Sequence, residues 1–214
     1  MTMITIWGRN TSSNVQVVMW AVAELGLEHE RIDWGGAFGG NDDPEYRAMN
    51  PNGVVPTIRD GELVMWESPA ILRYLGARYG DEGFWPADPA ERARLDMWAE
   101  WVKTSFCPPL IYNVFWQLVR TSEAQRSVAE IAEGAGKLKA LTPMIDNRLG
   151  DRPFINGDNL CFADIMLGHA LYRYYTLDFD RAMTPNLDAY YARLQERPAY
   201  LKHAMVSYES LRVK

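Results

Sequence analysis

The chain has few cysteines and histidines. It contains two cysteines, Cys107 and Cys161, and three histidines among its 214 residues. The cysteines do not form a CxxC pair and have no histidine nearby at metal-ligand spacing, so we expect neither a disulfide framework nor a metal site. His29, His169 and His203 are far apart in the sequence and are expected to be structural. Such sparse cysteine usage is typical of a protein of the reducing cytoplasm, which is the location we expect.

Long hydrophobic runs and an excess of basic charge are also missing. No segment approaches the roughly 20 apolar residues of a membrane span, and residues 1–9 lack the basic start and apolar stretch of a signal peptide. The 28 acidic residues outnumber the 22 basic ones, giving a net charge of −6, and the basic residues are scattered along the chain. The sequence therefore predicts no membrane insertion, no secretion and no nucleic-acid partner.

The composition that is present indicates an ordinary globular protein with two domains. Apolar residues make up 48% of the chain and charged residues 23%, and the length exceeds the roughly 100–150 residues of a typical domain. Residues 80–89 are rich in glycine, proline and acid, and strand patterns stop there. We therefore expect a first domain at 1–80, a linker at 81–89 and a second domain at 90–214.

The first domain is expected to be α/β. Residues 3–8 read as a strand, apolar residues at helical spacing between 15 and 25 predict a helix, and 29–34 read as a second strand followed by a loop at 35–43. Two apolar runs around Asp60-Gly61 predict a hairpin, and Ser68 is expected to begin a helix that ends at Tyr79. The resulting order is βαβ followed by ββα.

The second domain is expected to be all-α. Helical periodicity covers residues 90–120, 123–148, 162–176 and 185–195, with a shorter helix after Pro198. Pro108-Pro109 falls inside the first of these helices and is expected to kink or break it near Phe106.

Four short segments, in this order and at these separations, resemble the cytosolic glutathione transferase family across essentially the whole chain. They are Thr11–Asn14, Asn50–Pro56, Glu67–Ile71 and Gly157–Asp164. The serine-rich start is similar to the theta-like, serine-type bacterial branch. The resemblance implies a thioredoxin-like glutathione-binding domain followed by an all-helical domain, with glutathione as co-substrate.

Ser12 is the catalytic residue that this resemblance implies. A thiol has a pKa near 8.5, so the enzyme must favour the thiolate. A hydroxyl at a helix N-terminus does so by its hydrogen bond and by the positive end of the helix dipole. Thr11, Ser13 and Asn14 are close enough to replace Ser12 if the register differs. The alternative is that one of these residues only caps the helix.

Two further segments match the family's glutathione site. Val55-Pro56 resembles its Val-cisPro corner, where the backbone of the valine pairs with the cysteinyl part of glutathione. Glu67 and Ser68 match the residues that hold the γ-glutamyl end at a helix N-terminus. The alternatives are an ordinary turn at Pro56, a simple cap at Ser68 and a surface charge at Glu67.

Two positions depart from the family pattern. Many relatives carry Lys or Gln where this chain has Val54, which removes one ligand for the glycyl carboxylate and leaves backbone groups or residues 38–41 to compensate. Cys161 stands where the family has a Ser or Thr cap, three residues before Asp164. We interpret that segment as structural, with Asp164 still capping backbone amides.

A stripe of side chains runs along the first helix of the second domain. Trp98, Trp101, Ser105, Pro108 and Tyr112 follow each other at helical spacing. Such stripes are usually core, but the family places its electrophile pocket between this helix and the first domain. Pocket candidates are therefore Trp101, Ser105, Pro108, Tyr112 and, from a later helix, Tyr172.

The resemblance favours conjugation of glutathione to small apolar electrophiles, a detoxification reaction. It also implies a homodimer paired through the helix that starts at Ser68 and the first long helix of the second domain. Two alternatives stay open: glutathione-dependent peroxide or disulfide reduction by the same thiolate, and a binding protein that keeps the fold without catalysis.

Overall fold

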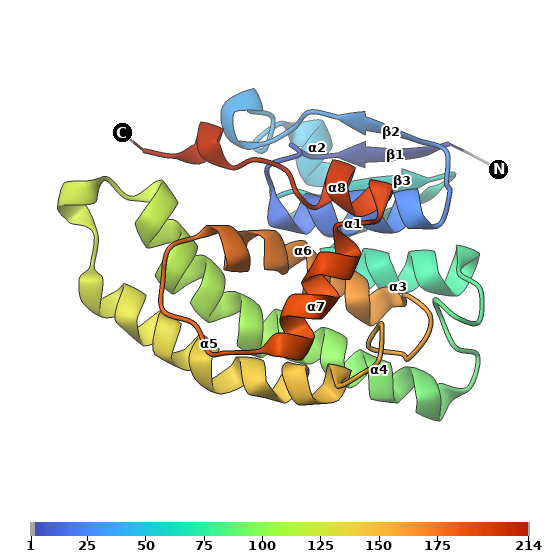
Figure 1. Cartoon of the computed structure of the whole chain (residues 1–214). Coiled ribbons are helices and arrows are strands. Elements are labelled where there is room, and N and C mark those ends of the chain that lie inside the picture. The colour runs from blue at the N-terminus through green and yellow to red at the C-terminus, as the bar shows by residue number, and fades with distance from the viewer. Residues whose placement is uncertain (1–2, 214) are drawn as a thin grey trace.

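The computed structural model describes residues 3–213 and places a small sheet beside a larger group of helices (Figure 1). The strands are β1 (Ile4–Trp7), β2 (His29–Ile32), β3 (Thr57–Asp60) and β4 (Leu63–Trp66). The α-helices are α1 (Ser13–Glu24), α2 (Pro44–Met49), α3 (Ser68–Tyr79), α4 (Pro89–Trp101), α5 (Val128–Leu149), α6 (Phe162–Thr176), α7 (Pro185–Leu194) and α8 (Pro198–His203). Short 3₁₀ turns lie at η1 (Gly36–Phe38), η4 (Glu123–Gln125) and η5 (Glu209–Leu211).

The sheet confirms the βαβ-ββα order. Its strands run in the order β2-β1-β3-β4, with β1 and β2 parallel and the other neighbours antiparallel. Two local features were not predicted: the segment expected to be a loop at 35–43 contains η1, and α2 follows it. Asp43 caps α2 by accepting a hydrogen bond from the amide of Glu45 at 2.8 Å. A six-residue helix shows too little periodicity for its pattern to be seen in the sequence.

The hairpin turn lies one residue later than predicted. Asp60 pairs with Leu63, so the two turn residues are Gly61 and Glu62. Asp60 stays in the strand because its carboxylate accepts hydrogen bonds from the hydroxyls of Tyr74 at 2.8 Å and Tyr79 at 2.5 Å. The hairpin is therefore fixed to α3, the helix that follows it.

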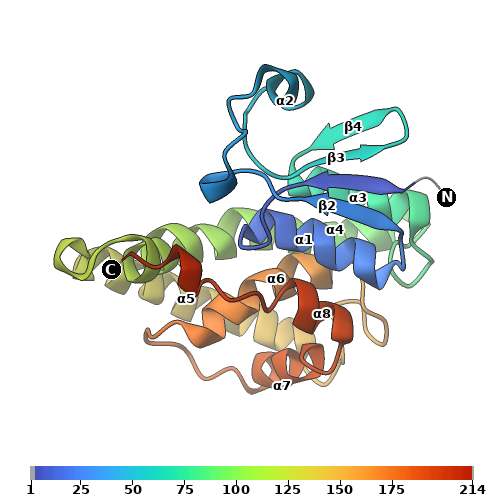
Figure 2. The same cartoon turned by 90° about the horizontal axis from the view of Figure 1, so that it is seen from above.

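Helices α1 and α3 pack beside each other, and α1 also packs against α6 and α8 (Figure 2). Trp20 of α1 is fully buried and meets Tyr200 edge to face, with ring centroids 4.8 Å apart. Gly168 of α6 permits this approach, because an added Cβ there would lie 2.5 Å from the Trp20 ring. The sheet-bearing part and the helical part thus share one continuous core.

The first helix of the second part continues through its two prolines, so of the expected kink or break near Phe106 the break does not occur. After α4 the hydrogen bonds widen into π-helical turns at η2 (Val102–Phe106) and η3 (Pro109–Arg120). The amide of Cys107 donates to the carbonyl of Val102, five residues earlier. Proline has no N–H to donate, so the regular α-helical hydrogen bonds cannot continue through this segment. The helix therefore widens near Phe106 instead of ending there.

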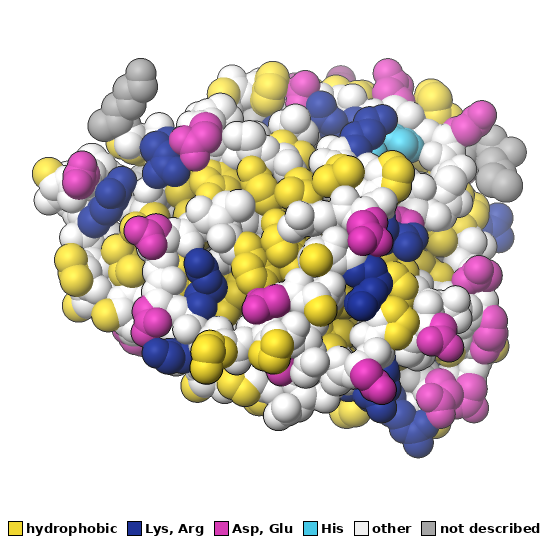
Figure 3. Space-filling model, in the orientation of Figure 1, with side chains coloured by type: hydrophobic (Ala, Val, Ile, Leu, Met, Phe, Trp, Pro, Cys, Tyr) yellow, Lys and Arg dark blue, Asp and Glu magenta, His cyan; other side chains and the backbone are white. Residues whose placement is uncertain are grey.

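Helix α6 begins and ends where its periodicity indicated, and α7 ends one residue earlier than predicted. Helix α5 begins at Val128, five residues later than predicted, because the start of the predicted segment forms η4 instead. Within residues 3–213, none of the helices combines the length and the apolar character required to traverse a bilayer. On the face shown in Figure 3, lysine and arginine side chains are scattered among acidic and hydrophobic ones.

Candidate active site

The N-termini of α1 and α3 meet at the edge of the sheet. Ser12 occupies the N-cap position of α1 in an extended conformation, and its side chain makes no capping hydrogen bond. The capping alternative is therefore not realised by this hydroxyl. Ser12 is 9% exposed and lines a cleft of about 430 Å³ between the sheet-bearing part and the helices. Ser12 therefore lies in this cleft at the positive end of the α1 dipole.

Asn14 connects the two helix ends. Its side-chain oxygen accepts a hydrogen bond from the hydroxyl of Ser68 at 3.2 Å and another from the ammonium of Lys103 at 3.3 Å. Ser68 is 2% exposed and is the first residue of α3. Asn14 therefore links the start of α1 to the start of α3 and to the helical part of the molecule.

The Val55-Pro56 peptide is cis, as the resemblance implied. Val55 lines the same cleft as Ser12, and Pro56 is buried beneath it. The carbonyl of Val54 accepts hydrogen bonds from the hydroxyl of Tyr46 at 2.8 Å and the amide of Asn50 at 2.7 Å. These bonds hold the segment that leads into β3 against α2.

Glu67 has an unusual backbone conformation. Its φ is +69°, a left-handed value that side-chain-bearing residues rarely adopt, and it precedes the first turn of α3. The side chain is exposed rather than buried in the core. The strained backbone of Glu67 sets the direction of its side chain at the N-terminus of α3, where the first amides of the helix are free.

Three arginines that the sequence did not single out also line the cleft: Arg9, Arg120 and Arg173. Arg173 is 2% exposed and donates to the side-chain oxygen of Gln16 at 2.7 Å and to the carbonyl of Thr11 at 3.1 Å. Burial lowers the pKa of Arg173 to about 10. In the sequence, the one signal for these arginines was Arg173, a charged residue among the apolar residues of the segment that forms α6.

Pro108 and Tyr112 line a smaller adjoining cavity of about 120 Å³ together with Ser13 and Asn14, and Tyr112 also lines the main cleft. Two buried groups in the small cavity are uncharged near neutral pH. Burial raises the pKa of the Cys107 thiol to about 12 and lowers the pKa of His169 to about 3. Neither residue supplies an anionic nucleophile or a cationic imidazole there.

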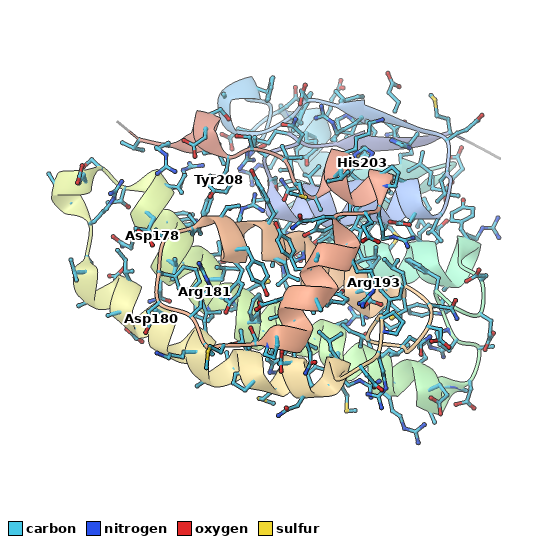
Figure 4. All side chains as sticks on the ribbon, viewed as in Figure 1. Asp178, Asp180, Arg181, Arg193, His203 and Tyr208 are labelled. Atoms are coloured by element: carbon cyan, nitrogen blue, oxygen red, sulfur yellow. The ribbon has the colours of Figure 1, made fainter. Side chains whose placement is uncertain are left out.

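The other three pocket candidates lie outside these two cavities. Trp101 packs between Trp98 and Phe106, with ring centroids 5.6 Å and 6.0 Å away, and Ser105 is half-buried. Tyr172 packs against Tyr208, with ring centroids 5.8 Å apart. Tyr208, labelled in Figure 4, lies in the chain segment that follows α8. Its hydroxyl is 2.9 Å from that of Thr176.

The residues that the structure describes include no group of three His, Cys, Asp or Glu side chains arranged to hold a metal ion. The polar side chains that line the main cleft carry hydroxyl, amide and guanidinium donors. Such donors bind and stabilise anions, a bound thiolate among them.

Comparisons with known proteins agree with this geometry. Residues 2–77 match the family model described as glutathione S-transferase, N-terminal domain, and residues 96–198 match that of the C-terminal domain. Glutathione S-transferase GstB of Escherichia coli (strain K12) is 38% identical, over 95% of this chain and 99% of that protein. Glutathione S-transferase F14 of Arabidopsis thaliana is 30% identical, over 92% of this chain and 79% of that protein.

A solved structure is also similar over almost the whole chain. It is the theta class glutathione S-transferase from the citrus canker pathogen Xanthomonas axonopodis pv. citri, with glutathione bound. The TM-score is 0.90 at 45% identity, covering 97% of this chain and 99% of that one. The chain described here therefore belongs to the glutathione S-transferase family, and its activity is glutathione-dependent group transfer.

Proposed function

We propose that Ser12 stabilises the glutathione thiolate and that the enzyme conjugates this thiolate to a small electrophile. The proposal rests on Ser12, which lines the main cleft at the N-terminus of α1 and whose hydroxyl makes no capping hydrogen bond. Each unit by which the thiol pKa falls requires about 1.4 kcal/mol of preferential stabilisation of the anion. A hydroxyl hydrogen bond to a charged acceptor, together with the helix dipole, is of that size.

Val55, Pro56, Glu67 and Ser68 orient the tripeptide in this proposal. The cysteinyl backbone pairs with Val55 as an added strand would. The γ-glutamyl carboxylate meets the amides at the start of α3 and the Ser68 hydroxyl, while Glu67 faces the ammonium group. The strained φ of Glu67 supports this role, since such strain concentrates at binding sites.

The acceptor occupies the part of the main cleft formed by η3. Its apolar wall consists of Ile111, Phe115 and Trp116, with Tyr112 beside them. Pro108 and Tyr112 also line the adjoining small cavity, whereas Trp101, Ser105 and Tyr172 lie outside both cavities. In this arrangement residues 1–80 bind glutathione, 81–89 link the two parts and 90–214 select the electrophile.

We further propose that the protein is a cytoplasmic homodimer. Both cysteines are unpaired, which suits a reducing compartment. Met97 of α4 is 65% exposed, and Leu63 and Trp66, which precede α3, are 41% and 37% exposed. These apolar side chains on neighbouring elements offer a surface for a second copy.

Replacing Ser12 by alanine tests the catalytic proposal. Turnover with glutathione and a neutral aryl halide should fall about a hundredfold, the usual cost of removing one donor to a developing or stabilised anion. The glutathione dissociation constant should change only a few-fold, because the hydroxyl acts on the thiolate more than on the bound tripeptide. Ser13→Ala is the comparison variant. Intact turnover in Ser12→Ala would assign the role to Ser13 or Asn14 instead.

A further inference from the structure

The main cleft combines a positive charge excess with an apolar wall. Among residues 3–213, Arg9, Arg120 and Arg173 line it, and no aspartate or glutamate does. The chain as a whole has a net charge of −6, so this local excess opposes the overall balance. A cleft lined by one sign of charge concentrates ligands of the opposite sign.

None of the three arginines forms an ion pair with a carboxylate within residues 3–213. Acidic side chains on the neighbouring segments are already paired: Glu209 with Arg212 at 2.8 Å, and Asp33 with Arg31. Arg173 contacts only neutral acceptors, the side chain of Gln16 and the carbonyl of Thr11. The positive charge of the cleft is therefore not neutralised by the protein itself.

Arg173 and Arg9 are held in place by their surroundings, whereas Arg120 is exposed at the end of η3. The guanidinium of Arg173 lies over the Phe115 ring, 5.2 Å from its centroid, and Gln16 is fixed by donating to the carbonyl of Asn10 at 2.9 Å. The side chain of Arg9 passes close to Gly36, so that a Cβ added to this glycine would lie 3.1 Å from the Arg9 side chain. Burial and the nearby charge of Arg120 lower the pKa of Arg9.

We propose that Arg9, Arg120 and Arg173 form a subsite for the carboxylate of the acceptor, so that the enzyme prefers small electrophiles carrying an acid group beside an apolar body. This inference rests on the proposed glutathione transfer at Ser12. Arg120 and Arg173 belong to η3 and α6, on the side of the cleft that carries Phe115 and Ile111. Arg120 and Arg173 thus come from the helical part that we assign to the acceptor, while Arg9 reaches the same cleft from the sheet-bearing part.

The reaction at such a substrate is a displacement. The thiol proton leaves to solvent when the thiolate forms, the sulfur attacks the electrophilic carbon, and the C–S bond forms as the carbon–halogen bond breaks. The halide departs with the bonding electron pair. The carboxylate stays unchanged and is bound by the guanidinium groups, which hold the carbon near the sulfur.

A matched substrate pair tests the proposal: para-(chloromethyl)benzoate and para-(chloromethyl)benzamide, which share the reacting carbon and differ in charge. At low ionic strength the benzoate should show a kcat/KM about tenfold above that of the benzamide, after each is divided by its uncatalysed rate. Arg9→Gln and Arg120→Gln should each remove most of this preference and leave the benzamide rate within about twofold. Arg152→Gln, an exposed arginine elsewhere, controls for net charge and should leave the preference intact.

Binding without reaction gives an independent readout. With glutathione saturating, para-methylbenzoate should inhibit conjugation of the benzamide more strongly than para-methylbenzamide, and the two arginine variants should abolish the difference. Equal kcat/KM for the two substrates in the wild-type enzyme would overturn the inference while leaving conjugation itself established. A raised KM for glutathione with the benzamide in both variants would assign the arginines to glutathione's own carboxylate, which also overturns it. Absence of conjugation with either substrate and with a neutral aryl halide would instead contradict the proposed function.

Discussion

At the scale of single residues, we expect a substitution of Glu67 to change folding stability and glutathione affinity in opposite directions. It is the one non-glycine residue within 3–213 that has a positive φ, and its side chain is exposed. A residue in such a conformation costs about 1–3 kcal/mol, which the surrounding structure must offset. The side chain of Glu67 is exposed, so packing in the core does not explain this cost. We therefore attribute the strained conformation to ligand binding at the N-terminus of α3.

Glu67→Gly should therefore raise the free energy of unfolding by about 1 kcal/mol, since glycine adopts positive φ without strain. The same change should raise the glutathione dissociation constant about fivefold, because an exposed charge contact is lost. Thermal unfolding and calorimetric titration measure the two effects. Ser68→Ala should raise the dissociation constant about tenfold by removing one hydrogen bond to a charged group.

Glu62→Gly is the matched control for this pair of measurements. Glu62 lies in the adjacent turn without a positive φ, so glycine there should lower stability slightly and leave glutathione affinity unchanged. If affinity is unchanged in both Glu67→Gly and Ser68→Ala, the γ-glutamyl site is not at the start of α3.

At the scale of elements, Asp164 anchors the start of α6. Its carboxylate is fully buried and accepts hydrogen bonds from the amide of Ile155 at 2.9 Å, the amide of Cys161 at 2.8 Å and the hydroxyl of Tyr190 at 2.9 Å. It therefore joins the turn before α6, the first turn of α6 and helix α7. Burial raises the pKa of this carboxyl, while these hydrogen bonds favour its ionised form.

Replacing Asp164 by alanine should cost about 3 kcal/mol or more, because three buried donors lose their acceptor together. Asp164→Asn should cost less, about 1–2 kcal/mol, since its oxygen still serves Ile155 and Tyr190 while its amide faces the N–H of Cys161. Urea denaturation measures both changes. Asp158→Ala, an exposed acid of the same loop, should be nearly neutral. A cost below 1 kcal/mol for the alanine variant would contradict the anchoring role.

The sequence predicted those elements whose pattern is long or whose chemistry is local. The βαβ-ββα order of the elements and the limits of α3 and α6 followed from periodicity and turn signals, and the cis geometry of Val55-Pro56 was implied by the family resemblance. The π-helical turns did not, because proline indicates that a helix is perturbed without specifying how the backbone hydrogen bonds rearrange.

The arginine cluster could not be predicted either. Arg9 is more than half of the chain away from Arg120 and Arg173, and only the packing of the β1–α1 segment against η3 and α6 brings the three to one cleft. Ser12 and Val55 were chosen from local motifs, and both line that cleft. Local motifs thus indicated the residues that we assign to glutathione, while the residues that we assign to the acceptor are brought together only by tertiary packing.

At the scale of the whole molecule, we expect two copies to pair through α3 and α4. Light scattering at micromolar protein should give twice the 24.4 kDa chain mass. Met97→Glu should shift the protein towards the monomer, because it places charges at the centre of the proposed two-fold contact. Met144→Glu is the control, since Met144 is 49% exposed on α5, outside that contact. A wild-type mass near 24.4 kDa would overturn the pairing.

The central claim is that this molecule lowers the pKa of the glutathione thiol through Ser12. The most direct measurement is the ultraviolet absorbance of the thiolate as a function of pH, with glutathione bound to the wild-type enzyme and to Ser12→Ala. The account predicts a thiol pKa at least one unit below its usual value of about 8.5 in the wild type, and a return towards that value in the variant. Identical titration curves for the two proteins would contradict it.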